Sequence, residues 1–256
     1  MYINNISIVY YLLIGLLGLA VGKVTAWANI VYVDEETPKI NDFWKRRKEL
    51  FPMQYIIMFV IAACYIGLLY IQGIPNTFLK ALDLVKFLIL TPMLISSFLI
   101  DLKYRIIPNR LNMFLFEIGI LLTFAYGISN ISIAQNMLLG GLTGIGIFLG
   151  ITLLGGLIAG KEAMGLGDVK FMGAVGLYFG MMATGEVTLL SFLLGAIISI
   201  LVLVYRAIRK VEDEYIPFGP FLVIAAFVVM FAGDGFVLRA FVSFCKMISN
   251  QLVSLF

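Results

Sequence analysis

A series of long apolar runs, separated by short polar segments, constrains the fold of this chain more than any other feature of its sequence. The runs lie near residues 6–33, 55–73, 79–100, 111–127, 137–158, 168–183, 187–205, 218–232 and 236–254. A helix needs about 20 mostly apolar residues to cross a bilayer. The run at 168–183 is short and contains glycines, and the last two are marginal. We therefore expect an all-α, polytopic membrane helix bundle with eight or nine transmembrane segments.

The composition supports this class of protein. Hydrophobic residues make up 62% of the chain and charged residues 13%, whereas soluble domains average about 45–50% and about 25%. No long linker separates the runs, so residues 1–256 are expected to form a single integral membrane domain. The basic residues lie in short clusters between runs, a distribution typical of membrane orientation. We expect the lipid bilayer as a partner and no nucleic acid.

The N-terminus and the basic loops predict how the chain lies in the membrane. Residues 1–5 contain no basic residue, so they do not resemble a cleaved signal peptide, and 6–33 is predicted to be a retained first helix. If the N-terminus faces outward, four loops rich in Lys and Arg face the cytoplasm, as the positive-inside rule requires. These loops are 34–54, 101–110, 159–167 and 206–217.

The consequence is a multi-pass protein of the cytoplasmic membrane whose sizeable polar excursion is the short cytoplasmic loop 34–54. That loop mixes acidic, basic and aromatic residues, and we expect it to lie on the headgroups. Asp101 and Asp168 both fall at the cytoplasmic surface in this arrangement. Glu162, Glu186, Asp83 and Asp234 lie near run ends and are expected to be solvated, whereas Glu117 is a possible cavity residue.

The chain contains no histidine and two isolated cysteines, Cys64 and Cys245. Catalytic triads that use histidine are therefore excluded, as are histidine-ligated metal sites and a paired-cysteine zinc site. We expect no metal and no resident cofactor. Any enzymatic chemistry must come mainly from carboxylates, lysines or hydroxyls.

Glycines are dense between residues 140 and 180, and many of them stand four apart. Such spacing lets helices approach closely in lipid, which explains it without a nucleotide-binding loop. The pairs are Gly140/Gly144, Gly146/Gly150, Gly156/Gly160 and Gly176/Gly180.

Asp168 and Asp101 each have an ordinary explanation when taken alone. Asp168 follows glycine at the start of an apolar run and suits a helix N-cap. Asp101 ends the run 79–100 beside Lys103 and would pass as a surface charge. Together, however, they are two carboxyl groups at the same membrane face, each at a junction between a helix and a loop. An acidic residue beside lipid is by default a functional hypothesis.

A pair of carboxyl groups offers a route to peptide hydrolysis without histidine or metal. Two carboxylates within about 3 Å of a shared site cannot both ionise, so one holds a proton. One group then activates water as a base while the other protonates the leaving amine. Gly165 and Gly167 permit a bend beside Asp168 and the close approach of another backbone, as an extended peptide substrate would require.

Three ordered motifs resemble one protein family. The sequence Gly165-Leu166-Gly167-Asp168 is similar to the GxGD motif of the type IV prepilin peptidases, which are membrane aspartyl proteases. Asp101 followed by Ile107-Pro108-Asn109 resembles the other catalytic stretch of that family. Residues 216–221, Ile-Pro-Phe-Gly-Pro-Phe, are similar to a late Pro-Phe-Gly-Pro segment. The resemblance covers about residues 79–232, which we take as the expected peptidase core.

The resemblance implies an activity and a set of site residues. Members cut the short basic leader from prepilins and pseudopilins on the cytoplasmic side, after a glycine and before the hydrophobic helix. It implies Asp101 and Asp168 as the catalytic pair, and a prepilin or pseudopilin as partner. Lys170 matches the lysine after GxGD, where it either biases the ionisation of the pair or snorkels to the surface. The residues expected to bind substrate or shape the loops are Gly165, Gly167, Lys170, Pro108, Asn109, Pro217 and Gly219.

The sequence departs from the larger family members in its first loop. Those members carry paired cysteines that bind zinc in a longer segment tied to N-methylation. The loop 34–54 is short and has no cysteine. We therefore expect neither zinc nor N-methyltransferase activity.

Two other functions remain open. A proton- or cation-coupled transporter also uses paired carboxylates and broken helices, but predicts acids nearer the midplane and inverted repeats. A GxGD protease of the presenilin or signal-peptide-peptidase type normally has Tyr before its first Asp, whereas Ile100 precedes Asp101 here.

Overall fold

The computed structural model describes residues 2–3, 6–33, 53–160, 164–209, 216–233 and 235–253, and almost all of these are helical. A two-residue hairpin, β1 (Tyr2–Ile3) and β2 (Ile6–Ser7), precedes the first helix. The helices are α1 (Ile8–Val33), α3 (Met53–Gln72), α4 (Phe78–Tyr104), α5 (Asn109–Ser129), α6 (Ile131–Ala159), α7 (Leu166–Arg209), α8 (Gly219–Ala232) and α9 (Phe236–Val253). The expected all-α polytopic bundle is confirmed.

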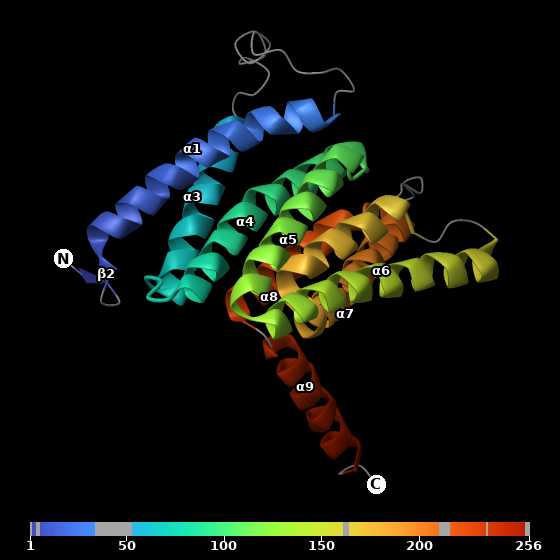
Figure 1. The fold of residues 1–256 in the computed structure, drawn as a ribbon. Coiled ribbons are helices and arrows are strands. Elements are labelled where there is room, and N and C mark those ends of the chain that lie inside the picture. The colour runs from blue at the N-terminus through green and yellow to red at the C-terminus, as the bar shows by residue number, and fades with distance from the viewer. Residues whose placement is uncertain are drawn as a thin grey trace.

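Figure 1 shows α4 and α5 side by side in the centre of the bundle. Helices α1 and α3 pack together on one side, while α6 and α7 lie on the other. Helix α9 extends away from the rest. Most of the predicted loop 34–54 lies outside the described residues, and its last two residues already belong to α3.

Eight or nine spans were expected, and the number found depends on whether each broken helix is taken as one span or as two. Among the described residues, six helices are long and apolar enough to cross a membrane, or seven if α8 and α9 together make one span. The runs 168–183 and 187–205 both lie in α7, which is broken at Gly180 into two helices, and the run 218–232 forms a helix of 14 residues.

Helix α7 is broken at Gly180, where φ is 77° and ψ is 176°. Only glycine adopts this conformation without strain. The side chain of Asn136 in α6 accepts a hydrogen bond of 3.1 Å from the backbone N–H of Met181, which caps the second half of α7. The two apolar runs are therefore two helical halves joined at Gly180 and held there by α6.

The glycines of α6 and α7 allow a backbone-to-backbone contact. A Cβ placed on Gly140 would overlap the carbonyl oxygen of Gly176, and a Cβ on Gly176 would overlap that of Gly140. The prediction of close helix packing is confirmed at this pair. It does not extend to every glycine of the series, because a Cβ on Gly146 or Gly150 would meet nothing within 4 Å.

Replacing Gly176 by Ala is expected to lower the free energy of unfolding, because the added methyl group must push α6 and α7 apart. Overpacking of this kind costs about 1–3 kcal/mol. The measurement is the unfolding midpoint of the purified chain in mixed micelles as denaturing detergent is added. Gly146→Ala is the matched control, since the same change there meets open space. Equal midpoints for the two variants would contradict the close contact.

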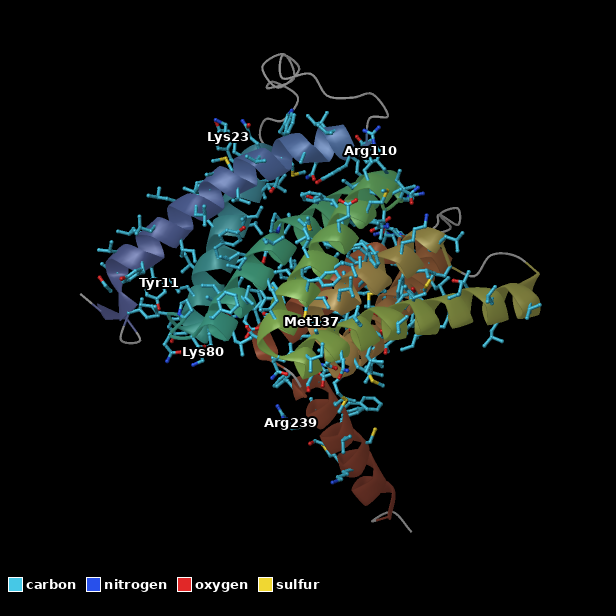
Figure 2. The ribbon with its side chains drawn as sticks, in the orientation of Figure 1. Tyr11, Lys23, Lys80, Arg110, Met137 and Arg239 are labelled. Atoms are coloured by element: carbon cyan, nitrogen blue, oxygen red, sulfur yellow. The ribbon has the colours of Figure 1, made fainter. Side chains whose placement is uncertain are left out.

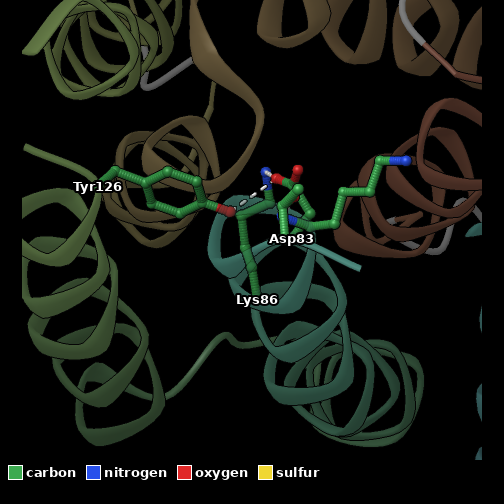
Figure 3. A network of polar contacts seen from close by, with 5 residues as sticks. Asp83, Lys86 and Tyr126 are labelled. Atoms are coloured by element: carbon green, nitrogen blue, oxygen red, sulfur yellow. Dashed lines mark hydrogen bonds and ion pairs between the residues drawn. The ribbon is translucent and has the colours of Figure 1, made fainter. Parts of the chain in front are cut away.

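The ends of α4 and α5 that lie away from Asp101 are joined by a small polar network (Figure 3). The hydroxyl of Tyr126 donates a hydrogen bond of 2.6 Å to Asp83, and the Lys86 ammonium donates one of 3.2 Å to the same oxygen. Lys86 also lies 4.7 Å from the ring centroid of Phe87. The network keeps α4 and α5 in register at this end.

Candidate active site

Asp101 and Asp168 lie at the ends of two different helices. Asp101 is in the last turn of α4, which ends where Arg105 adopts a left-handed conformation (φ 58°) and donates its N–H to the Asp101 carbonyl at 2.8 Å. Asp168 is in the first turn of α7, and its own N–H donates to the carbonyl of Gly165 at 3.1 Å. Both side chains are buried, with exposed fractions of 4% and 8%.

The two carboxyl groups line the same cavity, which has a volume of about 720 Å³. Its walls come from the end of α1, the connection between α4 and α5, and the turn that begins α7. The fold therefore brings into one polar cavity the two acids that the sequence placed at one face of the membrane.

The start of α8 presses against Asp101. A Cβ placed on Gly219 would overlap Oδ2 of Asp101, so the carboxyl group lies directly on the Gly219 backbone. The backbone N–H of Gly219 also interacts with this carboxyl group. The carboxyl group lies in a cavity large enough to hold water or a peptide. The first residue of α8 thus sets where the Asp101 carboxyl can lie.

Two hydrogen bonds tie the turn around Gly167 to α5. The Asn112 side chain donates to the carbonyl of Gly167 at 3.2 Å, and the Lys170 ammonium donates to Asn109 Oδ1 at 2.9 Å. The backbone of Gly167 also lies close to that of Ile107, because a Cβ on Gly167 would stand 3.6 Å from the Ile107 carbonyl oxygen. These contacts give Lys170 a bridging role that neither of its two sequence-based explanations included.

The cavity contains five of the seven residues expected to bind substrate or shape the loops, namely Pro108, Asn109, Gly165, Gly167 and Lys170. Pro217 and Gly219 do not line it, but Phe218 between them does. The glycines of the GxGD stretch do not have positive φ, and a Cβ on either would make only ordinary van der Waals contacts, at 3.7 Å from Asp168 for Gly165 and 3.6 Å from Ile107 for Gly167.

Sequence reasoning missed several residues of this site. Tyr32 and Val33 reach the cavity from the end of α1, and Arg105 lines it from the connection after α4. Asn112 is buried one turn beyond the Pro108-Asn109 pair. In the sequence, Asn112 could have been noticed as a polar residue near the start of an apolar run, whereas nothing local predicted Tyr32.

Two acidic residues outside the site, Glu186 and Glu117, do not lie where the sequence predicted. Glu186, predicted to be solvated, is 0% exposed, and neither of its carboxyl oxygens has a partner among the described residues. The prediction was wrong because the break at Gly180 places Glu186 inside the packed second half of α7. Glu117, by contrast, is exposed and does not line the cavity of the carboxyl pair.

Metal ligands do not gather in the described part of the chain. Within those ranges, no three Asp, Glu, Cys or His residues lie together as a metal site would require. Cys64 in α3 and Cys245 in α9 are both free thiols. The expectation of chemistry without a metal or cofactor stays a prediction.

The fold and the cavity define a multi-pass membrane protein with a buried carboxyl pair at one end of its helix bundle. Residues 88–200, which include both acids, match the model of the type IV leader peptidase family. No solved structure is significantly similar.

Several curated proteins are similar over the same region. The prepilin leader peptidase/N-methyltransferase of Aeromonas hydrophila is 33% identical over 147 residues, which are 57% of this chain and 49% of that protein. The protein of the same name from Legionella pneumophila is 33% identical over 56% of this chain and 48% of its own length. The protein of the same name from Pseudomonas aeruginosa is 32% identical over 57% of this chain and 49% of its own length. The chain spans about half the length of the curated relatives it matches.

Proposed function

We propose that this chain is an aspartyl endopeptidase that removes the basic leader of prepilin or pseudopilin proteins at the cytoplasmic face of the membrane. The observation that carries the proposal is the placement of Asp101 and Asp168, both buried, in one polar cavity at the end of a membrane bundle. The match of residues 88–200 to the type IV leader peptidase family supports the substrate class.

The carboxyl pair supplies both proton transfers of the reaction. In this mechanism the two carboxyl groups share one proton, because two negative charges buried in one cavity repel each other. The ionised group takes a proton from a water molecule in the cavity, and the resulting hydroxide attacks the scissile carbonyl carbon. The protonated group stabilises the carbonyl oxygen and then gives a proton to the departing amine nitrogen. The peptide bond is replaced by a new carboxyl group and a new amine, and the pair again holds one proton.

The charge distribution supports a cytoplasmic site. Lys103, Arg105 and Arg110 cluster where α4 ends and α5 begins, next to Asp101. Figure 2 shows Arg110 at this end of the bundle and Lys80 at the opposite end. Basic residues gather on the cytoplasmic side of membrane proteins, so we place the cavity there. A peptidase in this position meets a leader that has not crossed the membrane.

The names of the relatives also include an N-methyltransferase. We propose that this chain carries the peptidase alone, because the loop 34–54 has no cysteine and is too short for a further domain. Mass spectrometry of the cleaved product tests this directly. A methyl group on the new N-terminus would contradict it.

The experiment that tests the peptidase is cleavage by the purified chain in proteoliposomes. The probe is a model substrate with a lysine-rich leader ending in glycine, followed by an apolar helix of about 20 residues. We expect cleavage after the glycine, detected as two products by mass. Proton or cation flux across the same proteoliposomes without cleavage would instead support the transporter.

A further inference from the structure

A second cavity opens between α1 on one side and α4 and α5 on the other, and we call it the α1 groove. Its volume is about 570 Å³, and its lining is almost wholly apolar. The walls include Leu17, Val21 and Val24 on α1, and Leu111, Phe114 and Ile118 on α5. Phe114 and Val24 remain 45% and 61% exposed, so the walls present open apolar surface at the depth of the membrane.

The way α1 packs explains why the groove is open. A Cβ on Gly18 would overlap the backbone of Ala62, and a Cβ on Gly22 would overlap that of Met58. These glycines bring α1 into backbone contact with α3. Because α1 is fastened to α3 by its glycine face, the neighbouring face of α1, with Leu17, Val21 and Val24, does not close onto α5.

Pro92 lies in the wall of the groove contributed by α4. Proline has no N–H, so the carbonyl of Leu88, four residues earlier, lacks its helical partner. The Tyr65 hydroxyl of α3 donates to that carbonyl at 2.6 Å. The polar group that Pro92 would leave unpaired is therefore satisfied inside the protein, and the groove surface stays apolar.

The α1 groove leads into the cavity of the carboxyl pair. Tyr32 lines both. On α4, Ser96 lines the groove and Asp101 follows five residues later, about 7.5 Å further along the axis. On α5, Leu111 lines the groove and its neighbour Asn112 is bonded to Gly167. Three elements thus pass directly from the groove to the site.

We propose that the α1 groove binds the apolar helix of the substrate, and this rests on the proposed leader peptidase function. From Leu17 to Tyr32 the α1 wall is about 22 Å long, most of the roughly 30 Å hydrocarbon thickness of a bilayer. A helix seated there ends beside Tyr32. The peptide bond just before the helix then lies at Asp101 and Asp168, so the groove selects the cleavage position.

A smaller cavity of about 440 Å³, lined by Met113, Phe116 and Ile145 among others, lies between α5, α6 and α7. The hydrogen bond between Lys170 and Asn109 ties α5 to α7 between this cavity and the carboxyl pair. A helix bound in this second cavity would have to break that bond to bring its end to the site. The groove beside α1 requires no such change.

Cysteine cross-linking tests the position of the substrate helix. Cys64 and Cys245 are first replaced by Ala, and a single cysteine is then introduced as Val24→Cys, Phe114→Cys or, on the other side, Phe116→Cys. The probe is the model substrate with one cysteine in its apolar helix, cross-linked by a short bismaleimide. We expect adducts with the cysteines at 24 and 114 and none at 116.

An activity measurement accompanies the cross-linking. Val24→Trp fills the groove and is expected to lower kcat/KM for the membrane-embedded substrate at least ten-fold, mainly through KM. Leu153→Trp is the control, because Leu153 lies exposed on α6 and lines neither the groove nor the site.

The outcomes separate the two proposals. If the cysteine-free chain does not cleave the substrate, the leader peptidase function itself fails. If it cleaves but adducts form only at position 116, the groove assignment is overturned. The absence of adducts at every position, as when lipid fills the groove, also overturns it. Unchanged kcat/KM in Val24→Trp would overturn it as well.

Discussion

Asp101→Asn and Asp168→Asn are each expected to lower the rate of leader cleavage by at least about 100-fold, the usual contribution of one general acid or base. Asparagine has nearly the same size as aspartate, but it neither takes up nor releases a proton under these conditions. Each substitution therefore removes one of the two proton transfers while keeping the shape of the cavity. The measurement is the initial rate of product formation in proteoliposomes containing equal amounts of each variant.

Folding of these variants is not expected to suffer. Both carboxyl groups are buried, and replacing a buried ionisable group by a neutral one of the same size removes a desolvation cost. Asp83→Asn is the matched control, because Asp83 lies in the same helix as Asp101 but at its other end, in the network with Tyr126. It is expected to cleave at the rate of the unaltered chain. Full activity in either Asp101→Asn or Asp168→Asn would end the aspartyl mechanism.

Gly219→Ala is expected to lower cleavage by about 100-fold, although Gly219 carries no reactive group. Its Cβ would occupy the space of Asp101 Oδ2, so the carboxyl group must move. A displacement of about 1 Å in a catalytic arrangement costs roughly 100-fold in rate. The loss should appear in kcat, because the groove that we propose to bind the substrate helix is unaffected.

The same variant is expected to remain folded, because the new methyl group meets the Asp101 side chain and no backbone atom of α4. Equal unfolding midpoints for Gly219→Ala and the unaltered chain, together with lost cleavage, would show that the carboxyl position is what matters. Gly146→Ala controls for the substitution itself, since nothing lies within 4 Å of its added Cβ. If Gly219→Ala cleaves normally, the contact between α8 and Asp101 does not position the carboxyl group.

The class of protein followed from local properties of the sequence. Hydropathy and the length of the apolar runs are enough to predict membrane helices, and the structure confirms an all-α bundle. The three motifs likewise identified the family that residues 88–200 match. The alternation of the predicted helices also placed Asp101 and Asp168 at one end, but their catalytic role stays a proposal.

The details of the site could not be predicted in this way. Which glycine faces which backbone depends on the rotation of each helix, and hydropathy carries no information about rotation in lipid, where every face is apolar. Gly176 contacts Gly140 while Gly146 faces open space, although all belong to the same spaced series. Glu186 was expected at a solvated end and is fully buried, because the break at Gly180 changes where α7 turns.

By itself the sequence determined that this chain crosses a membrane as helices, and that its two candidate acids end helices at the same face. Only the tertiary structure decided that α8 begins against the Asp101 carboxyl, that α5 holds the turn before Asp168, and that α1 leaves a groove leading to both. The reason is physical. Helix formation depends on residues a few positions apart, whereas these contacts join segments that are distant in the chain and meet only through packing.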